Sequence, residues 1–166
     1  MTLALGRIAD GLASLGLRVA MAAVAAIVAL ILTEIVLRSG FGTSLLIVEE
    51  MVGYLMSTVV FAGLAPAARS GAMIRVDALV AQAPARARPI LTVAMQVMTL
   101  LLAGALGLFV LRSLLRFEER GTLSSGVWPI PLWVPEAAAL FGLLLFATVL
   151  ALGVIAPAKA EETRDG

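Results

Sequence analysis

The sequence has 166 residues, of which 61% are apolar and 14% charged, and its net charge is +1. Soluble domains average about 45–50% apolar and about 25% charged residues, and a soluble fold of this size buries only about 70% of its chain surface. A water-soluble domain is therefore excluded, and an integral membrane protein is predicted. The sequence has no Cys and no His, which excludes disulfides, thiolate or imidazole metal sites and a Ser-His triad. The small net charge argues against a nucleic-acid partner, and we expect no cofactor.

Four apolar stretches are long enough to span a bilayer as helices, each having about 20 residues or more. They predict an all-α membrane protein with four transmembrane helices and short tails on the cytoplasmic side. The first stretch is too long for the apolar region of a signal peptide. The predicted spans are 18–37, 45–68, 89–111 with a helical extension to 120, and 134–155, within a transmembrane domain of 18–155 that is flanked by tails 1–17 and 156–166.

The distribution of basic residues predicts the orientation of these spans. With the N-terminus inside, eight of the 12 Lys and Arg residues fall on the inner side. Positive residues are enriched in cytoplasmic loops. Both termini are therefore expected in the cytoplasm.

The segment between the second and third spans has a helical apolar pattern. Met73, Val76, Val80 and Ala83 recur at steps of three and four, and Pro84 follows them. This spacing predicts a short amphipathic helix lying in the membrane interface. The alternative is an ordinary cytoplasmic loop with one helical turn.

Acidic residues near the span ends are the first candidates for contacts, because charges are costly in lipid. Glu34 and Arg38 lie four residues apart, in the order that favours an ion pair on one helix. Glu49 and Glu50 are adjacent, so their side chains diverge by about 100° on a helix. One of the two is expected to face a protein partner or a cation. The alternative is that both simply favour the N-terminal end of the helix dipole.

Polar and small residues within the spans predict helix packing. Gln96 is the one amide deep in a span, and we expect it to hydrogen-bond another helix rather than a substrate. Small residues at helical spacing, such as Gly53 with Ser57 and Ala103 with Gly107, permit close helix contact. No Walker-type loop or central charged site is present, which is typical of an accessory membrane subunit.

The order of these features resembles the small membrane subunit, the DctQ-type small permease, of tripartite ATP-independent periplasmic (TRAP) transporters. The resemblance covers roughly residues 34–152. The motifs that carry it are Val48-Glu49-Glu50 with Tyr54, Arg69-Ser70-Gly71, Ile74-Arg75-Val76-Asp77, the stretch from Pro84 to Pro89, and Ile130-Pro131-Leu132-Trp133.

The resemblance implies a non-enzymatic scaffold subunit of a sodium-coupled solute importer in the bacterial inner membrane. Its partners would be a large TRAP membrane subunit that carries the substrate, commonly an organic acid, and through the complex a periplasmic solute-binding protein. We expect subunit contacts from Glu49, Glu50, Tyr54 and Gln96, lipid-headgroup or inner-edge contacts from Arg69, Arg75 and Asp77, and membrane-interface anchors at Trp128 and Trp133.

Two other functions remain open at this level. One is a self-sufficient dimeric four-helix exporter driven by protons, which would need a carboxylate near the middle of a span. The other is a membrane anchor subunit of a respiratory enzyme, which could not ligate haem in the usual way because the sequence has no His.

Overall fold

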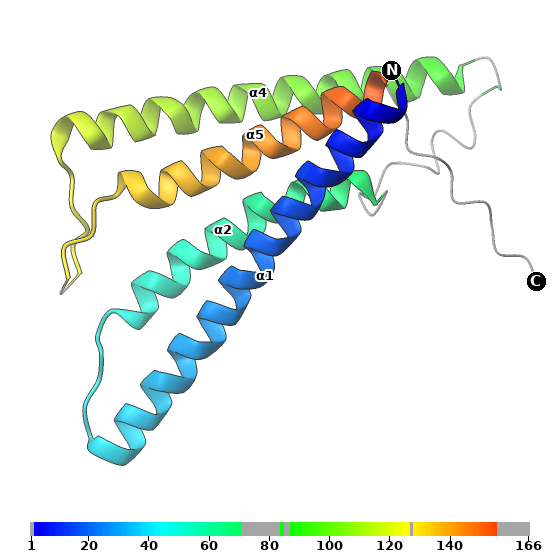
Figure 1. Ribbon diagram of the computed structural model, residues 1–166. Coiled ribbons are helices and arrows are strands. Elements are labelled where there is room, and N and C mark those ends of the chain that lie inside the picture. The colour runs from blue at the N-terminus through cyan, green and yellow to red at the C-terminus, as the bar shows by residue number, and fades with distance from the viewer. Residues whose placement is uncertain (1, 71–83, 85–86, 127, 156–166) are drawn as a thin grey trace, which may run out of the picture.

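The computed structural model describes residues 2–70, 84, 87–126 and 128–155 (Figure 1). In these ranges the chain forms four long helices, α1 (Thr2–Phe41), α2 (Val48–Arg69), α4 (Arg88–Arg120) and α5 (Trp133–Ile155). Each is long and apolar enough to cross a membrane, which confirms the predicted all-helical membrane protein with four spans. The predicted interfacial helix, with Arg75 and Asp77, lies outside the described residues.

The ends of the helices follow local sequence signals. α4 extends to Arg120 and stops at Gly121, whose φ of 56° is left-handed. The Gly121 and Thr122 amides donate to the carbonyls of Glu118 and Phe117, both at 3.1 Å. This is a glycine cap that satisfies the last carbonyls of a helix. With 33 residues, α4 is about 50 Å long and exceeds the hydrocarbon core of about 30 Å.

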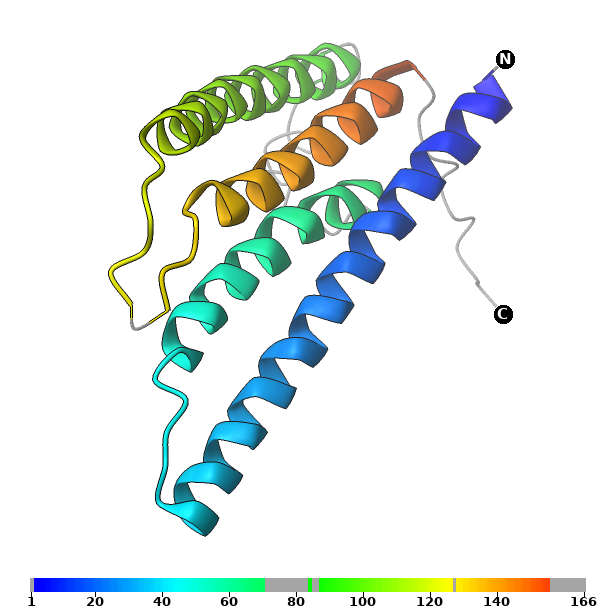
Figure 2. The same ribbon diagram turned by 60° about the vertical axis from the view of Figure 1, so that its left-hand side comes forward.

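The four helices lie side by side in the order α1, α2, α5, α4 (Figures 1 and 2). α1 packs on α2 and α5, α2 packs on α5, and α4 packs on α5. The connections 42–47 and 121–132 share one end of the molecule, called here the loop end. The start of α1 and the end of α2 lie at the opposite end. The helices splay apart toward the loop end, so the molecule has the shape of a fan.

Two glycines allow α1 and α5 to approach α2 closely on either side. A Cβ placed on Gly16 of α1 would lie 2.6 Å from the Ala62 carbonyl oxygen, and one on Gly142 of α5 would lie 2.6 Å from the Phe61 carbonyl oxygen. Real Cβ atoms do not come so near, so both positions require glycine. Ala62 itself is only 1% exposed. Small residues at such a crossing let helix backbones pack tightly in a membrane.

The expected small-residue contacts are found only in part. Ala103 is buried against Phe146 and Leu150 of α5. Gly53 and Gly107, in contrast, have nothing within 4 Å of an added Cβ, so they make no close packing within the described chain. The spacing of small residues identifies a helix face, but it does not say which helix lies opposite that face.

Candidate functional site

The acid pair opens α2 at the loop end, and its two side chains have different surroundings. Glu50 is half-buried, and its Oε1 accepts a hydrogen bond of 2.6 Å from the Tyr54 hydroxyl, one turn further along the helix. Glu49 is exposed and has no hydrogen-bond or ion-pair partner among the described residues. The adjacent acids therefore diverge as expected, one toward the chain itself and the other away from it.

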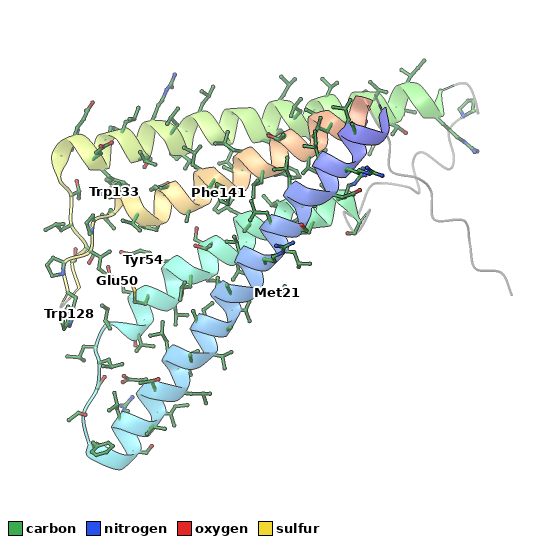
Figure 3. All side chains as sticks on the ribbon, in the orientation of Figure 1. Met21, Glu50, Tyr54, Trp128, Trp133 and Phe141 are labelled. Carbon is green, nitrogen blue, oxygen red and sulfur yellow. The ribbon has the colours of Figure 1, made fainter. Side chains whose placement is uncertain are left out.

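Glu50 lies against the connection between α4 and α5 (Figure 3). The described residues of this connection, 121–126 and 128–132, form a hairpin with an antiparallel bridge between Leu123 and Pro131. The Glu50 carboxylate lies beside the Ser124 side chain and fills the space above Gly126, where an added Cβ would overlap its Oε2. Glu50 thus holds the hairpin against the start of α2.

The hairpin keeps its shape through its own hydrogen bonds. The Ser124 amide donates to the Ile130 carbonyl at 2.8 Å, and the Leu132 amide donates to the Thr122 carbonyl at 3.1 Å. The Ser124 hydroxyl donates to the Trp128 carbonyl at 3.2 Å. Trp128 projects from the tip of the hairpin and is 63% exposed. Trp133, 43% exposed, is the first residue of α5, where aromatic side chains typically mark a membrane interface.

Glu34 holds the other connection at the loop end. Its carboxylate accepts hydrogen bonds from the Ser44 hydroxyl at 2.5 Å and from the Leu45 amide at 2.9 Å. The expected ion pair between Glu34 and Arg38 is not formed in the described chain. The physical reason is that the amides before α2 lack helical partners, and Glu34 satisfies one of them.

Arg69 closes the opposite end of the molecule. Its Nε lies 2.6 Å from Asp10 Oδ1 of α1, and its Nη2 donates to the Gly6 carbonyl at 3.5 Å. The Arg69 side chain is only 17% exposed, so in the described chain its contacts are with α1. The sequence did not single out Asp10, because its partner lies 59 residues away.

Gln96 is half-buried on α4, on the same face as Ala103 and Val110, which are both buried. Its amide has no hydrogen-bond partner within the described ranges. The expected bond to another helix is therefore absent from this part of the chain. A contact with another subunit would satisfy the amide, and this stays a prediction.

Sequence reasoning overlooked Glu136, in the first turn of α5. It is half-buried, and the Ser113 hydroxyl of α4 donates to its Oε1 at 3.3 Å. Glu136 lines a groove together with Tyr54 and Ser57 of α2. An acid directly after the third proline of a loop-to-helix junction carries no local signal for such a groove, because the other walls come from distant helices.

Comparison with known proteins adds one match. The sequence model of a family described as "Tripartite ATP-independent periplasmic transporters, DctQ component" matches residues 27–159, which is most of the chain. No curated protein and no solved structure matches the chain.

Proposed function

The chain belongs to the DctQ family of tripartite ATP-independent periplasmic transporter components, and from this premise we propose that it is the small scaffold subunit of a sodium-coupled solute importer. It packs against the large membrane subunit, which carries the solute, and a periplasmic binding protein delivers that solute, an organic acid. The complex lies in the bacterial inner membrane with both termini of this chain in the cytoplasm, so the loop end faces the periplasm. The small subunit itself catalyses no reaction.

The rigidity of the two ends supports a scaffold role. Glu34 and Glu50 each fix one connection at the loop end, and Arg69 ties α2 to α1 at the other end. Within the described ranges no three acids converge to hold a metal ion. A frame with fixed ends suits a static part of a transporter, against which another subunit moves.

The exposed face of α2 is the best candidate for contact with the large subunit. Glu49, Gly53, Met56 and Val60 are all exposed and follow one another at steps of four, three and four, which places them on one side of the helix. We call them the α2 free face. Gly53 leaves room for a partner helix to approach. Glu49 at its head offers a charge to a basic side chain of the partner. This unpaired acid on an open helix face is the observation that carries the proposed contact.

Co-purification tests this contact. We would express the chain with the large TRAP membrane subunit, solubilise both in mild detergent and measure how much large subunit is retained. Replacing Glu49 by Gln should reduce retention by about tenfold or more, since removing one member of a buried charge pair at an interface is costly. Replacing Glu119, an exposed acid at the end of α4, by Gln is the matched control and should have no effect. Equal retention of the large subunit by both variants would show that the interface lies elsewhere.

Transport by reconstituted proteins tests the proposed role itself. Liposomes that contain this chain, the large subunit and the binding protein should accumulate an organic acid when a sodium gradient is applied. Liposomes with this chain alone should not, because its described spans contain no unpaired acid near their middle. Transport by the chain alone would refute the scaffold role.

A further inference from the structure

A groove of about 470 Å³ opens between α2, α4 and α5 toward the loop end. It exists because α2 and α5 touch at Phe61 and Gly142 and then splay apart (Figure 1). Its walls are mostly apolar and include several aromatic rings. These rings belong to Tyr54, Phe61, Phe109 and Phe117.

One carboxylate stands in this apolar groove. Glu136 receives a single hydrogen bond from the described residues, that of the Ser113 hydroxyl to Oε1. None of the residues that line the groove is basic, and in the described chain Glu136 has no ion pair. A carboxylate can accept about four hydrogen bonds, and a charge beside an apolar surface is costly unless it is paired. The second oxygen of this carboxylate is therefore open to a cationic donor.

The depth of Glu136 indicates where that donor comes from. Trp133 opens α5 and marks the level of the lipid headgroups. Glu136 lies three residues further along, about 4.5 Å deeper. A cation that reaches Glu136 from the side of Trp133 thus comes from the headgroup layer. The groove below it lies level with the start of the acyl chains.

The chemistry of the groove selects among possible occupants, because its lining is mostly apolar and aromatic and contains one carboxylate, that of Glu136. An acyl chain is narrow and apolar and can lie between the rings. We propose that the groove binds a phospholipid with a primary-ammonium headgroup, with one acyl chain between the aromatic rings and the ammonium on Glu136. Phosphatidylethanolamine is a zwitterionic natural lipid of this chemistry.

The experiment compares two lipids that differ at the headgroup nitrogen. The full chain is purified in mild detergent and stripped of lipid. Phosphatidylethanolamine or phosphatidylcholine with identical acyl chains is then titrated back, and binding is followed by native mass spectrometry and by thermal stability. Both lipids carry the same net charge, but the trimethylated nitrogen of phosphatidylcholine has no N–H donor. The parent protein should bind phosphatidylethanolamine about tenfold more tightly, the difference expected for one charge-assisted hydrogen bond.

Two variants and one control assign that preference to the groove. Glu136→Gln keeps an acceptor for Ser113 but removes the charge, and it should abolish the preference between the two lipids. Ser57→Leu fills the groove and should weaken the binding of both lipids to the same extent. Glu119→Gln, at an exposed acid outside the groove, should behave as the parent.

Three results would overturn the proposal. They are equal binding of the two lipids by the parent, a preference that survives in Glu136→Gln, and a cysteine at position 57 that cross-links to the large subunit in native membranes. The last result would place a protein side chain in the groove instead of a lipid. These outcomes do not depend on transport, so they are separate from the test of the scaffold role.

Discussion

The contact between α5 and α2 at Gly142 is the most demanding packing feature of the molecule. A Cβ at Gly142 would lie 2.5 Å from the carbonyl carbon of Phe61, 2.6 Å from its oxygen and 2.7 Å from the amide nitrogen of Ala62. All three are backbone atoms of a helix, so no side chain can turn aside to make room. The change Gly142→Ala must therefore push the two helices apart.

The size of the effect follows from two opposing contributions. Overpacking in a well-packed interior costs about 1–3 kcal/mol, and in this case the rigid backbone favours the upper part of that range. Alanine in place of glycine within a helix stabilises that helix by up to about 1 kcal/mol. We expect Gly142→Ala to lower the free energy of unfolding by about 1–2 kcal/mol. Gly107→Ala is the matched control, because nothing lies within 4 Å of its added Cβ, and it should leave stability unchanged or slightly raised.

Thermal unfolding in one fixed mixture of detergent and lipid provides the measurement. Far-UV circular dichroism reports the helices, and tryptophan fluorescence reports the hairpin and the start of α5 through Trp128 and Trp133. The parent, Gly142→Ala and Gly107→Ala are compared at equal protein concentration. If the two alanine variants shift the transition by the same amount in the same direction, the close approach of α2 and α5 is refuted.

Two further predictions concern the loop end. Gly126→Ala should expel the Glu50 carboxylate from its place over the hairpin and raise the rate of protease cleavage within 121–132 to that of Glu50→Ala. Cleavage at the parental rate would show that Glu50 does not hold the hairpin. Reporter fusions after Thr43 and Thr122 should report the periplasm, and a fusion after Lys159 should report the cytoplasm, as the distribution of basic residues predicts. A periplasmic signal from the C-terminal fusion would contradict the proposed orientation.

The architecture was predictable from the sequence because the bilayer imposes it. A helix that crosses about 30 Å of hydrocarbon needs about 20 apolar residues, so hydropathy alone locates the spans. The end of α4 was also predictable, since Gly121 provides a local cap. In each case the cause lies within a few residues of its effect, and one sequence is enough to see it.

The partners of the charged residues were not predictable in the same way. Local spacing suggested that Glu34 pairs with Arg38, but the Ser44 hydroxyl and the Leu45 amide satisfy its carboxylate. Arg69 binds Asp10 across 59 positions. The divergence of the two adjacent acids at the start of α2 was foreseen from helix geometry, whereas the docking of the hairpin on Glu50 depends on how four helices assemble. Single-sequence patterns contain no information on that assembly.

The order of helix contacts also has a consequence for how the protein is made. α2 can pair with α1 as soon as both have left the ribosome, since they are neighbours in the chain. α4 is synthesised next, yet it packs only on α5 among the described helices. During synthesis α4 therefore has no packing partner among these helices until α5 has been inserted. Because α5 contacts all three other helices, it is the span that joins the first pair to α4, and this bundle of four closes only after α5 has been inserted.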